Sequence, residues 1–342
     1  MQKEGLEILL LTPRVTGVGG IAQHVRKLAR KLSIRGFRVD LVSAEYLKTP
    51  RLKRLANPSY ALCSPLKVFL RDYEIVHGHN LPSLPAVLYS SGKKILTLHG
   101  LYSKQIRLLH GKLFGYAANM IERTTLKKLD TITTVSIEAA CYYKSLGLRV
   151  EHIPNAVDLS DMPKEAERIS EPQIIYLGRL SYEKGVDLLL RAAFKYKVRG
   201  LVIAGDGPLR RYFEKAHEDK LLTYLGALPR QRALKILAGS DAAVIPSREE
   251  GVSTFLLEAM ALRVPVIATR VGGNVEIVRD RLDGLLVEPR VEEIVKAIGI
   301  VLGGLEDLEK ITSNAYRRIL EEFNWDIVLD KYLKLYSRIL NQ

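Results

Sequence analysis

Residues 246–269 read PSREEGVSTFLLEAMALRVPVIAT, and this stretch decides the fold. Pro246 ends an apolar run, and Gly251 allows a tight turn. Ser253 and Thr254 are residue types that cap helices, and the apolar residues after them recur at helical spacing. The run Val264–Ala268 then reads as a strand that is buried on both faces. The stretch therefore predicts a turn, a helix and a parallel strand in succession.

Two carboxylates bracket the start of this helix, Glu250 before it and Glu258 inside it. The first turn of a helix has backbone N–H groups without intrahelical acceptors, and the positive end of the helix dipole lies there. Such a site suits a phosphate. A sugar nucleotide, which carries both phosphates and hydroxyls, would suit the whole arrangement.

The same alternation of short apolar runs and amphipathic stretches continues over the rest of the chain. It is typical of α/β proteins with a doubly wound, mostly parallel sheet. The stretch Pro154–Pro172 interrupts the pattern, so two such sheets in tandem are expected. The predicted strands are Glu7–Thr12, Arg38–Ser43, Glu74–His77, Lys94–Leu98, Thr131–Val135, Val150–Ile153, Gln173–Leu177, Leu201–Ala204, Leu222–Leu225, Ala242–Ile245, Val264–Ala268 and Leu285–Val287, and the last predicted helices are Val291–Leu302, Glu306–Phe323 and Asp326–Leu340.

The composition is that of a globular chain with a large core. Its 342 residues are 47% hydrophobic, but no apolar run approaches the roughly 18 residues of a transmembrane helix. The first residues lack the pattern of a signal peptide. Cys63 and Cys141 lie in apolar surroundings without the spacing of metal ligands, so both are expected to be core thiols in a reducing cytosol.

Positive charge is concentrated in the first half of the chain. Residues 1–165 hold 25 Lys and Arg against 13 Asp and Glu, a net charge of +12, whereas the whole chain carries +14. This asymmetry favours an anionic partner for the first half, such as a membrane surface or a phosphate-bearing acceptor. Nucleic acid fits less well, because the basic residues lack interleaved aromatic side chains. A solvated basic surface is the alternative explanation.

The first loop contains the pattern Gly17-x-Gly19-x-x-Ala22, which superficially matches a dinucleotide-binding fingerprint. That fingerprint requires a tight turn directly after the strand, and here several loop residues intervene. The acidic residue at the expected distance, Asp40, falls in the middle of the second strand rather than at its end. A dehydrogenase is therefore disfavoured, and a glycine loop that lets the backbone approach a ligand is the better interpretation.

Cations and histidines follow several predicted strands. Arg179 and Lys184 come after the first strand of the second half, where open α/β sheets bind ligands, and could neutralise a diphosphate leaving group without a metal. His99 ends a strand of the first half and is expected to face a crevice rather than the core. His77 and His79 have no acidic or cysteine partner at ligand spacing, so a metal site is not indicated.

These motifs, in this order, resemble the family-4 retaining glycosyltransferases of the GT-B fold over essentially the whole chain. That resemblance implies two Rossmann-like domains that face a central crevice: residues 1–160 for the acceptor, with helix 326–342 packed back on them, and residues 161–325 for the nucleotide sugar. The motifs that carry the resemblance are Gly19-Gly20, Thr97-Leu98-His99-Gly100, Pro154-Asn155-Ala156-Val157-Asp158, Gly178-Arg179 with Lys184-Gly185, Gly205-Asp206-Gly207-Pro208, Pro246-Ser247, Glu250 with Glu258-Ala259-Met260-Ala261, Pro265-Val266, Gly272-Gly273 with Glu276, and Asp283-Gly284 with Leu286-Val287. One departure is Arg263, which stands where the family commonly has glycine.

The resemblance also implies a role for each site residue. Arg179 and Lys184 would bind the donor diphosphate, Glu258 the ribose hydroxyls and Glu250 the transferred sugar, while His99 would reach that sugar from the first domain. The expected catalytic residues are thus Glu250, His99, Arg179 and Lys184. The expected substrate-binding residues are Gly19, Gly20, Gly178, Gly251, Val252, Ser253, Thr254, Phe255, Leu256 and Glu258.

The implied chemistry is the transfer of a hexose-type sugar from a nucleoside-diphosphate sugar, with retention, by front-face attack of the acceptor. The family uses no metal and no cofactor, since the sugar nucleotide is a substrate. Glu250 and Glu258 flank a helix turn rather than a glycosidic bond, so a covalent carboxylate intermediate is not indicated. A GT-B sugar-nucleotide epimerase, a glycan phosphorylase and a non-catalytic nucleotide-sugar-binding protein remain as alternatives.

The basic first half favours an acceptor that is phosphorylated, lipid-linked or at a membrane surface. Residues Lys104–Arg123 mix apolar and basic side chains and suit an anionic membrane interface, and a core helix is the other explanation. A cytoplasmic protein, peripheral on the inner face of the membrane if this helix binds lipid, is expected. The sugar, the nucleobase and the acceptor are not specified by the sequence.

Overall fold

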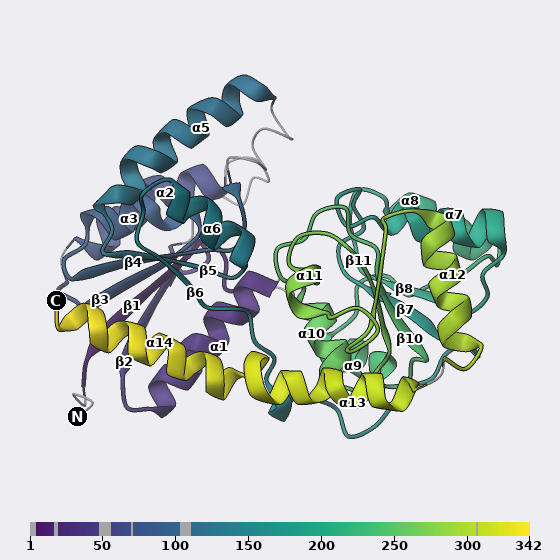
Figure 1. Ribbon diagram of the computed structural model, residues 1–342. Coiled ribbons are helices and arrows are strands. Elements are labelled where there is room, and N and C mark those ends of the chain that lie inside the picture. The colour runs from purple at the N-terminus through teal and green to yellow at the C-terminus, as the bar shows by residue number, and fades with distance from the viewer. Residues whose placement is uncertain (1–4, 17–19, 48–55, 70, 103–110, 306) are drawn as a thin grey trace. The chain divides into compact units, whose positions relative to one another are not determined.

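The computed structural model describes residues 5–16, 20–47, 56–69, 71–102, 111–305 and 307–342 (Figure 1). The chain divides into two compact units, which we call unit 1 (Met1–Asn155 with Asp326–Gln342) and unit 2 (Ala156–Trp325). Each unit contains one six-stranded sheet whose neighbouring strands are all parallel. The predicted α/β class with doubly wound parallel sheets is confirmed.

The sheet of unit 1 has the strand order β2-β1-β3-β4-β5-β6. Strand order reverses between β1 and β3, and such a switch point is where open α/β sheets bind ligands. Two of the strands match the sequence prediction to the residue, whereas β3 continues two residues further, because His79 still pairs with Thr97 of β4. The strands are β1 (Glu7–Thr12), β2 (Arg38–Ser43), β3 (Ile75–His79), β4 (Lys93–Leu98), β5 (Thr131–Thr134) and β6 (Val150–His152).

Helices cover both faces of this sheet (Figure 1). One face packs an apolar core in which strand residues such as Leu9 and Leu96 meet Val87 of α3 and Tyr143 of α6. The other face is covered by α1 and α14, and near the middle of the sheet histidine side chains contact tyrosines of α14. The helices of unit 1 are α1 (Gly20–Ile34), α2 (Ala56–Val68), α3 (Leu84–Tyr89), α5 (Lys112–Thr125), α6 (Ile137–Ser145) and α14 (Trp325–Leu340), with short 3₁₀ turns at Leu81–Ser83 and Leu126–Lys128.

The sheet of unit 2 has the order β12-β11-β10-β7-β8-β9, with its switch point between β7 and β10. Its strands are β7 (Ile174–Leu177), β8 (Leu201–Ala204), β9 (Thr223–Tyr224), β10 (Ala242–Ile245), β11 (Val266–Thr269) and β12 (Leu285–Val287). Its helices are α7 (Val186–Tyr196), α8 (Arg210–Glu218), α9 (Arg230–Ala238), α10 (Thr254–Ala261), α11 (Asn274–Ile277), α12 (Val291–Leu302), α13 (Leu308–Arg318) and the π-helical turn η4 (Ile319–Phe323), with a 3₁₀ turn at Leu159–Asp161.

Strand β11 begins two residues later than the sequence predicts, because the end of α10 uses those residues. The N–H of Val264 donates to the carbonyl of Ala259 at 2.9 Å, which closes the last turn of the helix. Arg263 at this turn has φ 57°, the left-handed conformation that favours glycine. Its guanidinium lies 4.5 Å from the ring centroid of Tyr316, a cation–π contact that offsets part of the backbone cost.

The expectation that both cysteines are core thiols is wrong. Cys63 of α2 and Cys141 of α6 are exposed. The prediction assumed that apolar neighbours in the sequence mean burial. Around Cys63 this assumption fails, because the nearby Leu62 and Leu66 are themselves 77% exposed.

Candidate active site

Two loops of unit 2 meet at the switch point of its sheet, one after β7 (residues 178–185) and one after β10 (residues 246–253). The backbone N–H groups of Arg248 and Glu249 both donate to the carbonyl of Glu183, at 2.9 and 3.2 Å. Gly185 has φ 63°, and a Cβ atom there would lie 1.8 Å from the carbonyl oxygen of Pro246. The two loops are therefore fixed to each other by close backbone contact.

This contact brings together two residues that are 66 positions apart in the sequence. The Lys184 ammonium donates to both carboxylate oxygens of Glu250, at 2.7 and 2.8 Å. The Glu250 side chain is only 7% exposed, whereas that of Lys184 is 32% exposed. The Ser247 hydroxyl also donates to Glu250, at 2.9 Å. The carboxylate is thus held in place, and the cation sits at the solvent side of the pair.

The sequence identified Ser247 only as part of the motif Pro246-Ser247. In the structure its hydroxyl donates to the Glu250 carboxylate and thereby orients it. The carbonyl of Ser247 accepts a hydrogen bond of 2.5 Å from the buried hydroxyl of Thr269 at the end of β11. The loop that carries Glu250 is therefore anchored to the neighbouring strand as well.

Arg179, the other predicted diphosphate ligand, is exposed at the start of the β7 loop. Its carbonyl accepts a hydrogen bond of 2.8 Å from the hydroxyl of Tyr176. Burial raises the pKa of Tyr176, so this phenol stays protonated and keeps its donor. Arg179 thus follows Gly178 on a backbone that the buried tyrosine holds in place.

The predicted helix cap is confirmed at the start of α10. The side chain of Ser253 accepts a hydrogen bond of 3.3 Å from the N–H of Leu256. That amide was expected to meet a phosphate, but in the structure it donates within the helix cap. Helix geometry leaves the first-turn amides of Thr254 and Phe255 without an intrahelical acceptor, so these two are the better candidates.

Glu258, the predicted ribose ligand, is buried in α10 and forms an ion pair with Arg230, the first residue of α9. Burial raises the pKa of the Glu258 carboxyl, and the attraction of Arg230 opposes that rise. A second nitrogen of Arg230 lies 4.0 Å from a carboxylate oxygen of Asp161. A ribose bound at Glu258 would therefore share the carboxylate with Arg230.

Sequence reasoning missed Arg230, although one signal was present. A cation in the first turn of a helix is unfavourable next to the positive end of the helix dipole. Arg230 occupies that position directly after Pro229, and the first turn of α9 holds no acidic residue. A charge so placed indicates a partner elsewhere in the fold, here Glu258.

Gly272 and Gly273 lie against the turn that carries Glu250. The N–H of Gly273 donates to the carbonyl of Glu250 at 3.0 Å. A Cβ atom on Gly273 would lie 1.4 Å from the carbonyl oxygen of Gly251. No side chain fits at this point, which explains why the sequence has two glycines before α11.

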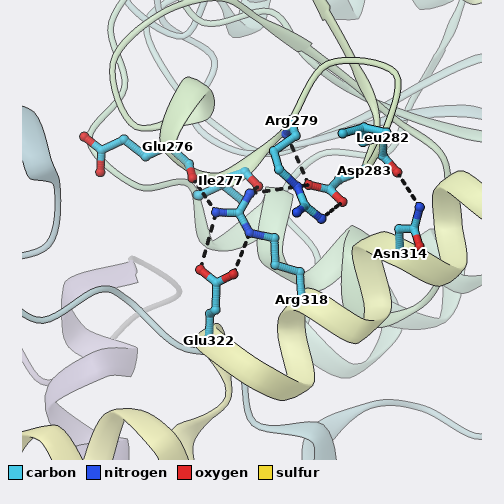
Figure 2. A network of polar contacts seen from close by, with 8 residues as sticks. All are labelled: Glu276, Ile277, Arg279, Leu282, Asp283, Asn314, Arg318 and Glu322. Carbon is cyan, nitrogen blue, oxygen red and sulfur yellow. Dashed lines mark hydrogen bonds and ion pairs between the residues drawn. The ribbon is translucent and has the colours of Figure 1, made fainter.

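A polar network fixes the far end of α11 (Figure 2). Arg318 of α13 donates to the carbonyls of Glu276 and Ile277 and also pairs with Asp283, whose side chain is fully buried. The guanidinium of Arg279 donates to the same carboxylate at 2.6 and 2.7 Å, and the backbone N–H of Arg279 donates to it at 3.2 Å. The network therefore ties α13 to the segment that supports the Glu250 turn.

The predicted residues of the first domain lie in unit 1. His99 follows β4 and is half-buried; its N–H donates to the side-chain oxygen of Asn80 at 3.1 Å. Gly20 is the first residue of α1. Gly19 lies outside the described residues. Unit 2 thus brings together Lys184, Glu250 and Ser247, pairs Glu258 with Arg230, and places Arg179 on the same loop as Lys184, while His99 and Gly20 belong to unit 1.

In the part of the chain that the structure describes, no group of three or more His, Cys, Asp or Glu side chains could hold a metal ion. Asp206, near the β8 loop, accepts a hydrogen bond of 2.8 Å from the N–H of Gly207, as expected for a turn residue.

Comparison with solved structures identifies the fold. A sucrose-phosphate synthase from Thermosynechococcus elongatus superposes with a TM-score of 0.84 at 19% identity, over 99% of this chain and 100% of that one. The catalytic domain of starch synthase IV from Arabidopsis thaliana gives a TM-score of 0.74 at 15% identity, over 99% of each chain. The fold is therefore GT-B.

Sequence relatives agree with this fold. An uncharacterised glycosyltransferase of Methanocaldococcus jannaschii is 25% identical over 95% of each chain. One component of the human phosphatidylinositol N-acetylglucosaminyltransferase is 26% identical over 94% of this chain and 74% of that protein. Residues 18–161 match Glycosyltransferase Family 4, and residues 159–318 match Glycosyl transferases group 1. Because the two matches together span residues 18–318, the chain belongs to this family of glycosyltransferases.

Proposed function

We propose that this protein transfers a hexose-type sugar from a nucleoside-diphosphate sugar to an acceptor, with retention of the anomeric configuration and without a metal. The observation that carries the proposal is the Lys184–Glu250 pair at the switch point of unit 2. A cation and a fixed carboxylate stand there beside the exposed Arg179 and the start of α10. The cations suit a diphosphate and the carboxylate suits the hydroxyls of a sugar.

The chemistry follows from where charge develops. When the bond between the anomeric carbon and the phosphate oxygen breaks, the sugar gains oxocarbenium character and the diphosphate gains negative charge. Lys184 and Arg179 stabilise that negative charge, and Glu250 orients the sugar. Glu258 holds the ribose, and His99 contributes a further hydrogen bond to the sugar. The acceptor attacks on the face that the diphosphate leaves, which gives retention.

Two structural relatives support a nucleotide donor. The Anabaena protein HepE, with a TM-score of 0.69 at 16% identity, was solved in complex with UDP-glucose. The starch synthase relative was solved with ADP and acarbose. Since these two ligands carry different bases, the fold accommodates more than one nucleotide.

The test of the proposal is a donor screen followed by product analysis. We expect one of UDP-, GDP- or ADP-hexoses to raise the melting temperature of the protein, because a ligand that binds only the folded state stabilises it. The same donor should release nucleoside diphosphate in the presence of chelator when a suitable acceptor is added, and NMR of the product should show the anomeric configuration of the donor.

Three outcomes would contradict the proposal. Binding of a nucleotide sugar without turnover on any acceptor would indicate the non-catalytic alternative. Conversion of the donor to its epimer would indicate the epimerase alternative. An inverted anomeric centre in the product would rule out front-face transfer.

We further propose that the acceptor is presented at an anionic membrane surface. Leu113, Tyr116 and Met120 on α5 are 77%, 68% and 53% exposed and follow one another at helical spacing. On α2 and directly after it, Leu62, Leu66 and Phe69 form a second exposed apolar stripe. The stripe on α5 argues against a core helix over the described part of the stretch Lys104–Arg123. Residues 104–110 of that stretch lie outside the described residues.

The setting of these stripes fits a peripheral rather than a spanning mode of binding. The first 165 residues carry a net charge of +12, which attracts anionic lipid. None of the described helices is both long and apolar enough to cross a membrane. The human relative is named for phosphatidylinositol, which supports a lipid acceptor.

Membrane binding makes a direct prediction. At low salt the protein should sediment with vesicles that contain anionic lipid and stay in solution with neutral vesicles. Replacing Leu113, Tyr116 and Met120 by serine should weaken that binding, because each exposed apolar side chain contributes roughly 1 kcal/mol or more of burial in the interface. The control is Tyr212→Ser in unit 2, because Tyr212 is 64% exposed on α8. This variant should sediment with the vesicles like the unchanged protein. Binding that does not depend on anionic lipid would contradict this idea.

A further inference from the structure

Four histidines gather on the polar face of the sheet in unit 1: His24 of α1, His77 and His79 of β3, and His99 after β4. Their rings form a connected group, with centroids 4.6 Å apart for His77 and His79, 5.6 Å for His79 and His99, and 5.3 Å for His24 and His99. Two tyrosines of α14 complete the group. The hydroxyl oxygen of Tyr336 lies 2.7 Å from Nδ1 of His77, and that of Tyr332 lies 3.1 Å from Nε2 of His24.

Burial keeps these imidazoles neutral. It lowers the pKa of His24 to about 4 and that of His77 to about 3. It also lowers the pKa of His79 and His99 well below the usual value, and the neighbouring imidazoles lower it further, since like charges at this distance repel. Each ring therefore carries one proton at neutral pH, on one of its two nitrogens.

The position of that proton on His79 follows from its surroundings. Nδ1 of His79 lies 3.3 Å from Nε2 of His99, so one nitrogen donates to the other. Nε2 of His79 is buried and has no hydrogen-bond partner among the described residues. A buried N–H without an acceptor costs more than an unused lone pair and is rare in proteins. The proton of His79 is therefore on Nδ1 and is donated to Nε2 of His99, which leaves the proton of His99 on Nδ1.

The next residue, Asn80, fixes the backbone of His99. Asn80 has φ 61° and ψ 163°, a conformation almost confined to glycine, which costs about 1–3 kcal/mol. Its side-chain oxygen accepts from the N–H of His99 at 3.1 Å, and its own N–H donates to the carbonyl of Thr97 at 2.8 Å. The last residue of β3 and the one after it thus hold both the ring and the main chain of His99.

We propose that His79 is a positioning residue that holds His99 in the Nδ1–H tautomer, so that His99 donates a hydrogen bond from Nδ1 to an oxygen of the bound sugar. This inference rests on the function proposed above, in which His99 contacts the sugar. His79 does not touch the substrate. It acts by occupying Nε2 of His99, which leaves Nδ1 as the nitrogen available to a ligand.

The amide of asparagine can replace an Nδ1–H donor, and this provides matched variants. Asn at position 79 keeps an N–H near the position of Nδ1, whereas Leu has a similar volume and no donor. His217→Leu in unit 2 is the control, because His217 lies in α8, outside the proposed site. The tautomer of His99 can be read from the nitrogen chemical shifts of the full-length protein labelled in histidine, with His99→Asn used to assign its signals.

The expected results separate the two claims. His99 should be the Nδ1–H tautomer in the unchanged protein and in His79→Asn, and should shift toward Nε2–H in His79→Leu. With the donor identified by the screen, His79→Leu should lower kcat about 100-fold, since misplaced groups in active sites have effects of that size. His79→Asn should restore most of that loss, and the control should behave like the unchanged protein.

Specific findings would overturn the inference. An Nε2–H tautomer of His99 in the unchanged protein would refute it without any mutation, even if His79→Leu does not fold. A shifted tautomer with full turnover would show that His79 does not position a catalytic group. If no nucleotide sugar were turned over at all, the proposed function would fail, while the tautomer measurement would still decide the structural claim.

Discussion

Replacing Lys184 by alanine should lower kcat about 100- to 1,000-fold, the range seen when one preorganised group that stabilises developing charge is removed. The Lys184 side chain is 32% exposed and its ammonium lies 2.7 Å from Glu250, so the cation is fixed beside the place where we expect the diphosphate to leave. The substitution removes that cation and also leaves the almost buried Glu250 carboxylate without its charged partner. Steady-state kinetics with the donor found by the screen would measure the loss.

The two effects of this substitution can be separated with Glu250. The double variant Lys184→Ala with Glu250→Gln removes the unpaired charge, so it should recover the thermal stability that Lys184→Ala loses, while its turnover should stay low because both residues act on the donor. The control is Lys215→Ala, because Lys215 pairs with Asp219 at 2.9 Å on the exposed side of α8. Unchanged turnover in Lys184→Ala would refute the role of this cation in leaving-group departure.

The inner strands of both sheets were predictable because each is buried on both faces. A parallel strand covered by helices on both sides is a continuous apolar run, and such a run is visible in the sequence. The strands Leu201–Ala204 and Ala242–Ile245 were predicted to the residue for this reason. The errors fall at strand ends. Strand β11 begins late because the N–H of Val264 donates back to the end of α10, and β3 ends late because His79 still pairs with Thr97.

The site was less visible than the strands because its contacts are distant in the sequence. Motif positions predicted Lys184 and Glu250 separately, but their ion pair depends on the order of β7 and β10 in the sheet. Arg230 and Glu258 lie 28 residues apart and meet only because α9 and α10 pack together.

The histidine cluster was hidden for a related reason. His77 and His79 looked isolated in the sequence, because their partners come from α1, from the end of β4 and from a helix more than 250 residues further along the chain. Strand register and helix packing decide these neighbours, and no local pattern encodes either.

Gly273→Ala should abolish most activity while leaving the fold in place. The new Cβ would lie 1.4 Å from the carbonyl oxygen of Gly251, so one of the two segments must move. The α11 segment is held at both ends, so it cannot move away easily. Arg318 donates to the carbonyl of Glu276 at its far end, and the side-chain amide of Asn274 at its start donates to the carbonyl of Thr269 at 3.0 Å. The turn that carries Glu250 has to shift instead. We expect a fall in kcat of about 100-fold from this displacement and a loss of roughly 1–3 kcal/mol of stability from overpacking.

Gly299→Ala is the matched control for that prediction. Gly299 lies inside α12, and a Cβ there would meet nothing within 4 Å. Alanine should therefore stabilise the protein by about 0.5–1 kcal/mol, because glycine loses more backbone entropy in a helix, and should leave kcat unchanged. Urea unfolding and steady-state kinetics of both variants provide the measurement. If Gly273→Ala kept full activity, the Glu250 turn would tolerate displacement, and the fixed position of this carboxylate could not be part of the mechanism.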